Sequence, residues 1–593
     1  MTSTHRGYVS RAILCLGLVL SCTAAWAQSL IVSPDNSDLQ ARLQAEASVL
    51  SLPANAQSGD IIATAQGDYG RLLAVLYDEG YFGASISIQL SGREAATLSA
   101  FGTSGALRPV RIAVDLGRPF RFGTVSVQPL PDGATLPEAF QPGAPAGTGT
   151  IQRAAQDSVA LWRSASHAKA EVSGQDIVAR HPSATLDVAL RIDPGPPLRF
   201  GRFVVPEAAE VRAERLRAIG GLPSGEPFDP AAVERVRSRL VRTGAFNSVV
   251  VREAETPNAD GTLDIILDVE AAPRRRIGFG AEVETRDGIS LEAFWLSRNV
   301  FGGAERLRFD FDLDGIGADT GGVDVALGGR LTIPGFRRPD DTLEIFALFE
   351  RLNEVTFRST SFETGARRER QVRDDLVIGA GASLRFSDTE DALGSRQFRH
   401  IVFDFDATRD RRDDALDARD GTYAQLTARP FVGVSDGSGT GVRLTGDFRV
   451  YRAVSERSVI AGRLQFGSVL GSAQAETPPE FLFFSGGGGT VRGQSFQSLG
   501  IDTPDGVIGG RGFLGASVEL RRDVTDAIGV VGFLDVGYVS ESGTFEDGDS
   551  HAGVGVGVRY RTALGPIRAD IGVPVGGDSR NDFGIFIGIG QAF

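Results

Sequence analysis

The last eleven residues of the chain alternate strictly between two faces. One face carries glycines, Phe586 and Ala592, and the other carries Phe583, Ile585, Ile587, Ile589, Gln591 and Phe593. Successive side chains of a β-strand point to opposite faces, so this run predicts a strand. Strands of a membrane β-barrel alternate because one face meets lipid and the other lines the lumen. We therefore expect residues 583–593 to be a terminal membrane strand that closes a barrel against the first strand.

The same period of two recurs from Arg276 onward. Between residues 306 and 314, five charged side chains alternate with four apolar ones, Leu307, Phe309, Phe311 and Leu313. Five charges on one face of a strand require water on that face, which a barrel lumen provides. Residues 274–593 number 320, which is enough for a transmembrane antiparallel β-barrel of about 16 strands with their turns. The alternative is a large soluble β-protein.

The start of the chain predicts export. Residues 1–27 contain two arginines, an apolar stretch and then Ala25-Trp26-Ala27, which is typical of a cleaved signal peptide. Both cysteines, Cys15 and Cys22, fall in this segment, so we expect the mature chain to contain no thiol. Lipidation at Cys22 is the alternative, but Val19-Leu20-Ser21 is a poor approach to a lipidated cysteine. The net charge of −14 argues against a nucleic-acid partner.

The first half of the chain repeats itself. Residues 114–123 recur as residues 192–201 at an offset of 78, and a looser copy near residues 269–276 follows at an offset of 77. Such periods indicate consecutive copies of one supersecondary unit. In the third copy, Asp229-Pro230 has the form of a helix start. We place three α+β modules at residues 28–117, 118–196 and 197–273, before the barrel at residues 274–593.

A candidate site follows a glycine run. Residues 486–489 are four glycines, followed by Thr490 and by Val491-Arg492-Gly493. Alternation places Glu519 on the polar face of one predicted strand, and Phe533 and Asp535 on the inward face of the next. An arginine that enters the lumen from the loop could form paired hydrogen bonds with both carboxylates. The alternative is a flexible surface loop with no such role.

These residues resemble motifs of the BamA/TamA superfamily of outer-membrane assembly proteins: the Val491-Arg492-Gly493 loop and the Phe533-x-Asp535 strand. The resemblance implies that the repeats are periplasmic POTRA modules in front of a transmembrane barrel. It also implies that Arg492, in the loop after strand 11, contacts Glu519 and Asp535 on strands 12 and 13. One departure exists, because Gln494 replaces the usual aromatic residue and Phe496 follows two positions later.

Within the superfamily, three modules and the sequence of residues 564–575 are most similar to the TamA family. That resemblance implies a protein that inserts and folds β-barrel proteins, such as autotransporters, into the outer membrane. The implied partners are unfolded barrel clients, the lipid bilayer and a TamB-like protein anchored in the inner membrane. The alternative is a two-partner-type secretion pore that exports a soluble polypeptide through the lumen.

The expected route for insertion is strand addition at a lateral seam between residues 276–285 and residues 583–593. Glycine weakens a strand, so glycines on both seam strands would lower the stability of the pairing. The alternative role of these glycines is tight packing inside the lumen. The predicted seam residues are Gly278, Gly280, Ala281, Gly584, Ile587, Gly588, Gly590 and Phe593.

Signals of enzyme chemistry are weak. Gly433-x-Ser435-x-Gly437 matches a hydrolase nucleophile motif, but that motif requires a strand-to-helix turn and an alternating strand follows here. None of the five histidines has the spacing of a metal ligand pair. We therefore expect no enzyme activity, no metal site and no cofactor.

Overall fold

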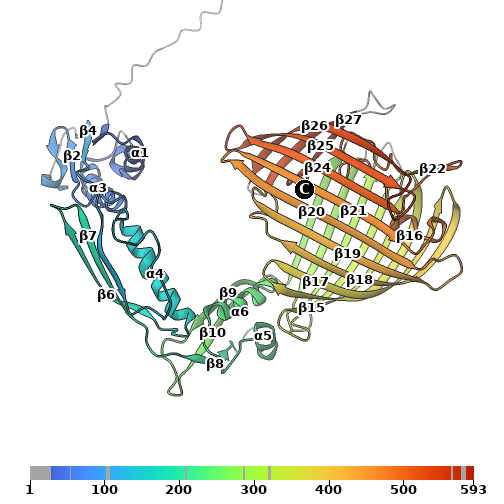
Figure 1. Ribbon diagram of the computed structural model, residues 1–593, viewed down its shortest axis with the longest axis horizontal. Coiled ribbons are helices and arrows are strands. Elements are labelled where there is room, and N and C mark those ends of the chain that lie inside the picture. The colour runs from blue at the N-terminus through green and yellow to red at the C-terminus, as the bar shows by residue number, and fades with distance from the viewer. Residues whose placement is uncertain are drawn as a thin grey trace, which may run out of the picture. The chain divides into compact units, whose positions relative to one another are not determined.

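The computed structural model describes residues 29–53, 55–101, 107–206, 210–284, 288–317, 322–562, 565–575 and 583–593. The predicted signal peptide lies outside these residues. The described chain forms two compact units, one that ends at Leu198 and includes Pro227–Pro230, and one formed by Arg199–Glu226 and Ala231–Phe593. Figure 1 shows the elements of both units. No described helix combines the length and the apolar character needed to cross a membrane.

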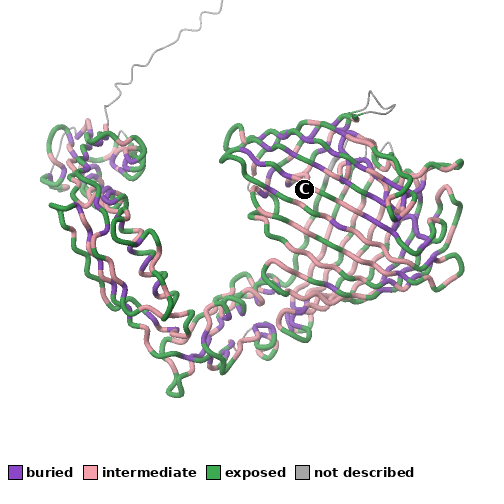
Figure 2. The backbone as a smooth tube through the Cα atoms, viewed as in Figure 1, coloured by how far each residue is buried: buried purple, intermediate pink, exposed green. Residues whose placement is uncertain are grey.

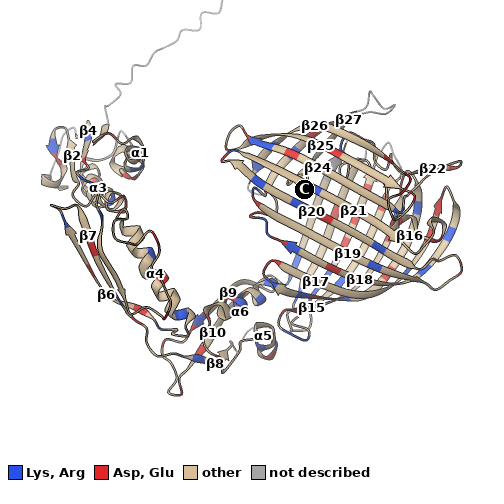
Figure 3. Ribbon diagram, in the orientation of Figure 1, with Lys and Arg blue, Asp and Glu red and all other residues tan. Residues whose placement is uncertain are grey.

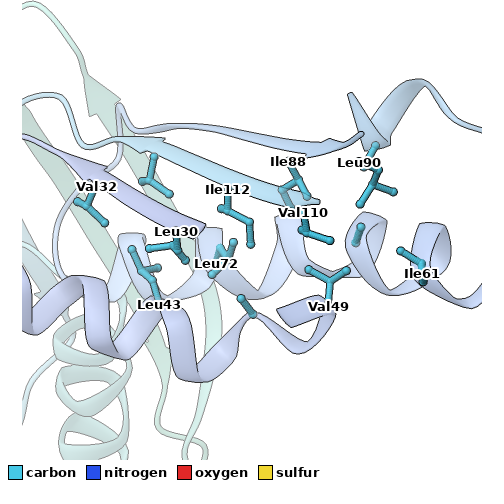
Figure 4. Close-up of a cluster of buried hydrophobic side chains, with 14 of the residues drawn as sticks. Leu30, Val32, Leu43, Val49, Ile61, Leu72, Ile88, Leu90, Val110 and Ile112 are labelled. Carbon is cyan, nitrogen blue, oxygen red and sulfur yellow. The ribbon is translucent and has the colours of Figure 1, made fainter. Parts of the chain in front are cut away.

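The first unit begins with a sheet of order β1-β4-β2-β3. The packed interior holds Leu30, Leu72 and Ile112 (Figure 4). Asp68 is fully buried. Its carboxylate is satisfied there because it accepts hydrogen bonds from the backbone N–H groups of Ser48 and Val49 at the start of α2. The elements are β1 (Ser29–Ser33), α1 (Ser37–Glu46), α2 (Ser48–Ser51), α3 (Ser58–Asp78), β2 (Ser85–Leu90), β3 (Arg93–Glu94), η1 (Ala95–Thr97) and β4 (Val110–Asp115).

Two three-stranded sheets follow, each with a parallel and an antiparallel pair. The order is β5-β7-β6 in the first and β8-β10-β9 in the second. The elements are β5 (Arg121–Gln128), α4 (Thr148–Ser164), β6 (Glu171–Arg180), β7 (Thr185–Asp193), β8 (Arg199–Val204), α5 (Ala213–Gly220), α6 (Pro230–Arg242), β9 (Phe246–Glu253) and β10 (Thr262–Ala271). Helix α6 starts at Pro230, as the sequence predicts.

The two copies of the sequence repeat share one local device. In each, an aspartate on the central strand accepts the backbone N–H of the residue after a glycine: Asp187 from Thr124, and Asp264 from Arg202, both at 2.8 Å. A Cβ on that glycine, which is Gly123 in one copy and Gly201 in the other, would collide with the carboxylate of the aspartate. This device gives a physical reason for glycine at the same position of each copy.

The second half is a closed antiparallel barrel of sixteen strands over the described residues. Its strands are β11 (Arg275–Glu284), β12 (Gly288–Arg298), β13 (Arg306–Ile316), β14 (Asp324–Pro334), β15 (Asp341–Asn353), β16 (Phe357–Arg373), β17 (Leu376–Asp391), β18 (Gly394–Asp410), β19 (Gly421–Gly433), β20 (Gly441–Ser455), β21 (Ser458–Leu470), β24 (Gly512–Asp523), β25 (Ile528–Ser540), β26 (Gly548–Thr562), β27 (Gly565–Val575) and β28 (Gly584–Ile589). The fold therefore has an α/β region of POTRA type before a barrel, as predicted.

The barrel wall has one apolar and one polar face. On β13, Phe309 and Phe311 are exposed on the outside, whereas Arg308 and Asp310 point inward and pair at 2.6 Å. Exposed and more buried residues alternate along the strands in Figure 2, and charged residues lie on many of them in Figure 3. This arrangement is typical of a wall between lipid and a polar lumen.

The end of the chain corrects one prediction. Strand β28 stops at Ile589 and does not continue to Phe593. Gly590 takes a left-handed φ of +91° and donates its N–H to the carbonyl of Pro566 at 2.7 Å. Phe593 is buried against Tyr451 and Ala461. The strand is shorter than its alternation suggests because the glycine turns the chain and Phe593 finds an apolar contact inside the barrel.

Candidate functional site

Much of the long connection between β21 and β24, residues 471–511, lies against the inner wall of the barrel, whereas its β22–β23 hairpin projects at the rim (Figure 1). It contains η2 (Gln474–Glu476), η3 (Pro479–Phe481), β22 (Ile501–Thr503) and β23 (Gly506–Ile508). Phe481 and Phe483 of this lumenal loop belong to a buried cluster with side chains of five barrel strands, which are Val402, Phe431, Val469, Phe513 and Val539. Apolar burial of this kind stabilises the loop in place.

Arg492 is the centre of a buried ionic site in this loop. Its Nε and Nη2 donate to the two carboxylate oxygens of Asp535 at 2.8 and 3.0 Å, and its backbone N–H donates to the same carboxylate at 3.1 Å. Its Nη1 donates to Glu519 at 2.7 Å. The guanidinium also lies over the ring of Phe533, 3.6 Å from the centroid. The structure therefore brings together the predicted residues Arg492, Glu519, Phe533 and Asp535.

Three charged residues of this site were not predicted as its members. Nη1 of Arg492 also contacts Asp570 at 3.1 Å, and Asp570 pairs in turn with Arg559. Arg521 donates to Glu519 at 2.8 Å. The site thus holds three carboxylates and three guanidiniums, all less than a tenth exposed. The equal number of opposite charges compensates the cost of burial. Alternation in sequence already places Asp570 and Arg559 on inward faces, but strand pairing was needed to connect them.

Glycines on the wall make room for the loop. A Cβ at Gly553 of β26 would collide with the carbonyl of Arg492, and one at Gly572 of β27 would lie 2.7 Å from the amide nitrogen of Gly493. Gly493 itself has a left-handed φ of +93°. The loop backbone, including the fully buried Val491, therefore approaches the wall more closely than side chains would allow.

Gln494 has a polar role at the position where the resemblance implies an aromatic residue. Its side-chain amide donates to the backbone carbonyl of Ala552 on β26 at 2.8 Å. Phe496 is about a third exposed, with 36% of its surface accessible. A hydrogen bond to the wall thus takes the position of an aromatic contact in this chain.

A second ionic anchor holds the first part of the loop, and sequence reasoning missed it. Glu480 accepts from Arg385 at 3.0 Å and from the hydroxyl of Ser387 at 2.7 Å. Arg385 also donates to Glu363 at 2.8 Å, and Arg429 donates to the other oxygen of Glu363 at 2.8 Å. No short motif marks Glu480, so only the inward positions of the two arginines could have suggested a partner.

The seam between β11 and β28 has few paired residues in the described part of the chain. Within the described residues these strands share one residue pair, Glu284 with Phe586. In contrast, β11 shares ten pairs with β12, and β28 shares six with β27. Ile277 and Phe279 on the outer face of β11 are largely exposed. Among the described residues of the seam, few backbone hydrogen bonds therefore need to break for β11 and β28 to separate.

The predicted seam residues fall into different environments. Gly278 and Gly280 lie on β11 opposite Phe294 and Glu292 of β12, and the ring of Phe294 fills the space where a Cβ of Gly278 would be. Packing in the lumen therefore accounts for Gly278. Ala281 and Ile587 are exposed on the outer face. Gly584 and Gly588 lie on β28 opposite Gly572 and Arg568, whereas Gly590 and Phe593 have left the strand.

The residues after β28 contact the ionic site. Arg521 donates to the backbone oxygen of Phe593 at 3.1 Å, and Arg559 donates to the side chain of Gln591 at 2.8 Å. The same two arginines pair with Glu519 and Asp570. The end of the chain and the lumenal loop are thus attached to one network.

The hydrolase-like motif lies in a connection between two barrel strands and not at a strand-to-helix turn. Ser435 lies in the connection between β19 and β20, where its hydroxyl contacts that of Ser438 at 2.9 Å. Over the described part of the chain, no three histidine, cysteine or acidic side chains are grouped so that they could hold a metal ion.

Comparison with known proteins supports the architecture. Residues 284–593 match the model of the Omp85 superfamily domain. Among solved structures, the chain is similar to BamA from Haemophilus ducreyi lacking POTRA domains 1–3, with a TM-score of 0.60 and 16% identity over 79% of this chain and 99% of that one. It also matches CdiB from Acinetobacter baumannii, with a TM-score of 0.48 and 13% identity over 80% of this chain and 90% of that one. Since the family match covers more than half of the sequence, the chain belongs to the Omp85 superfamily.

Proposed function

We propose that this chain inserts and folds β-barrel proteins, autotransporters among them, in the outer membrane by strand addition at the β11–β28 seam. An Omp85 barrel preceded by POTRA-like modules implies an outer-membrane protein whose modules lie in the periplasm. The observation that carries the proposal is that the described residues of β11 and β28 share a single pair. An incoming strand could replace one weak pairing and gain a full set of backbone hydrogen bonds.

The attachment of the loop inside the lumen supports the same choice. The lumenal loop is held by the Arg492 site, by the Glu480 anchor and by the buried Phe481 and Phe483. Export of a polypeptide through the lumen would require all three contacts to break. Insertion at the seam leaves them in place. The secretion pore is therefore the second candidate, and the experiment below separates the two.

The TamA-like assignment and its partners belong to the proposal. The three modules at residues 28–117, 118–196 and 197–273 would receive unfolded clients along their sheet edges. Strands β6 and β9 are such edges, and Ile177 and Val250 are half exposed on them. A TamB-like protein anchored in the inner membrane would dock on the modules and supply clients. The Arg492 site would act as a lock that keeps the loop in the lumen.

The test is a reversible disulfide across the seam. Glu284 and Phe586 are partners in the strand register of the seam, so both are replaced by cysteine, and the predicted mature chain contains no other thiol. The control pair, Ala569 and Ile587, faces across the β27–β28 pairing and should not need to open. We expect client assembly in proteoliposomes to stop when the seam pair is oxidised, to return on reduction, and to be unaffected in the control. Full assembly with the seam locked would refute the proposal and favour export.

A further inference from the structure

One side of the barrel carries a group of arginines at the rim that contacts helices α5 and α6. We call it the arginine belt, and it comprises Arg337, Arg338, Arg368, Arg370, Arg373, Arg409 and Arg411. These residues come from the β14–β15 connection, from β16 and its turn, and from the end of β18 and the residue that follows it. The acids counted with them are Asp341, Asp374 and Asp375, whereas Glu369 and Asp410 pair with Arg367 and Arg412, which are outside the belt. The belt therefore has seven cations and three anions.

Each of two acids is shared by several arginines. Asp341, fully buried, pairs with Arg370 at 2.7 Å and also with Arg368. Asp375 lies 2.9 Å from Arg409, 2.5 Å from Arg411 and 3.7 Å from Arg373. One carboxylate cannot neutralise two or three guanidiniums, so unused N–H donors and net positive charge remain at the surface.

The neighbouring Asp340 forms its ion pairs with arginines outside the belt. It pairs with Arg239 of α6 at 2.6 Å and with Arg242 at 3.2 Å. Arg337 and Arg338, three and two positions before Asp340, are exposed beside the half-exposed ring of Phe336. An aromatic ring flanked by guanidiniums is typical of a segment at a membrane surface.

The belt lies at the edge of the outer apolar face. Arg368 and Arg370 have the same orientation on β16 as the exposed Phe362, and they stand opposite Ala380 and Ile378 of β17. Arg409 has the orientation of the exposed Phe405 on β18. In a bilayer, the side chains at this edge meet the lipid headgroups. Arg239 and the backbone of Pro334 connect the same rim to α6 and α5, so this is the leaflet that faces the modules.

We propose that the arginine belt binds the phosphate groups of anionic phospholipids in the leaflet that faces the modules. Guanidinium groups bind phosphate through paired hydrogen bonds, and the shared acids hold them side by side. In the order of the barrel, β16–β18 lie across from the β11–β28 seam. Lipid bound here would fix the wall opposite the seam. The inference requires a barrel in a bilayer and does not depend on client insertion.

The experiment compares lipid association in nanodiscs that hold the full-length protein. The discs contain phosphatidylcholine with a minor fraction of spin-labelled phosphatidylglycerol or spin-labelled phosphatidylcholine, and electron paramagnetic resonance gives the immobilised fraction of each. We expect preference for phosphatidylglycerol. The triple variant Arg337→Gln, Arg338→Gln, Arg373→Gln should lower the preference at least fivefold, because one arginine at a membrane surface changes affinity by about that factor.

Two further variants control for damage to the fold. Arg358→Gln alters the same strand and outer face as Arg370 but lies at the opposite rim, so the preference should not change. Asp374→Asn with Asp375→Asn frees three guanidiniums and should raise the preference. Equal association of the two lipids with the native protein, or an unchanged preference in the triple variant, would overturn the proposal. Displacement of the labelled lipid by inorganic phosphate would instead assign the belt to free phosphate and also overturn it.

Discussion

Replacement of Arg492 by alanine should destabilise the barrel more than any single exposed ion pair could. The native side chain makes four hydrogen bonds, two with Asp535 and one each with Glu519 and Asp570. Without it, three buried carboxylates remain against the two guanidiniums of Arg521 and Arg559. Loss of one partner from a buried ionic group costs about 3–5 kcal/mol because a charge is left without compensation.

The double variant Arg492→Ala, Asp535→Ala restores equal numbers of opposite charges. Its loss should therefore be smaller than the sum of the two single losses, by about 0.5–3 kcal/mol, which is the usual coupling of residues in contact. Arg492→Lys should be intermediate, since one ammonium group cannot form paired bonds with Asp535 and also reach Glu519. Arg308→Ala is the control, because its ion pair with Asp310 is partly solvated and is worth about 1 kcal/mol or less.

The chain offers a simple reporter for this measurement. It has three tryptophans, and Trp295 on β12 is the one within the barrel. In a Trp162→Phe background, urea titration of the protein in phospholipid vesicles follows barrel unfolding through Trp295. A cysteine at the fully buried Val491 reports separately on release of the loop, through its reaction with maleimide. If Arg492→Ala costs less than about 1 kcal/mol and Cys at position 491 stays protected, the ionic site does not hold the loop.

Three further predictions concern other contacts. Gly553→Ala should expose a cysteine at position 491 to maleimide, because the new methyl group displaces the carbonyl of Arg492, whereas Gly532→Ala on the next strand has free space and should leave it protected. Glu480→Ala should lower the temperature at which the folded band converts on SDS gels, since Arg385 loses a buried partner, and exposed Glu476→Ala should not; equal shifts would contradict the second anchor. Burial raises the pKa of Asp264, but the backbone N–H and guanidinium of Arg202 and the amide of Asn258 outweigh it and hold the pKa below its usual range. Its contribution to stability is thus present above about pH 4 and lost as pH falls through the lowered pKa. Asp264→Ala should cost about 1–3 kcal/mol at neutral pH and should raise hydrogen exchange in β8, unlike Asp268→Ala, whose ion pair with Arg252 is exposed.

Alternation predicts the barrel well because each strand of the wall has one face toward lipid and one toward the lumen, which requires apolar and polar residues to alternate. Every inward or outward position argued from sequence for Leu307–Leu313 follows from which residues water tolerates on each face. The pairing of Arg492 with Glu519 and Asp535 could also be predicted from the sequence, because both acids lie on inward faces of neighbouring strands. Here a local pattern and the tertiary arrangement agree.

The remaining parts depend on contacts between distant segments. Glu480 and Arg385 are 95 residues apart, and neither has a local pattern that indicates the other. The last strand was predicted too long for a related reason. Alternation continues through Gln591 and Phe593, but in the structure Gln591 accepts a hydrogen bond from Arg559 and Phe593 packs against Tyr451 inside the barrel. The alternation of residues does not distinguish a strand that continues to Phe593 from a chain end that turns into the lumen.

The contacts of the last four residues join the lock to the seam. Arg521 binds both Glu519 and the backbone of Phe593, and Arg559 binds both Asp570 and Gln591. Release of Arg492 leaves excess negative charge that draws these two arginines toward the carboxylates, at the expense of their bonds with the end of the chain. The seam strand β28 is six residues long and has six pairs with β27 but one described pair with β11, so on its seam side the residues after it help to hold it in position. A loop variant should therefore also change hydrogen exchange in β28, and a seam disulfide should slow the labelling of a cysteine at position 491.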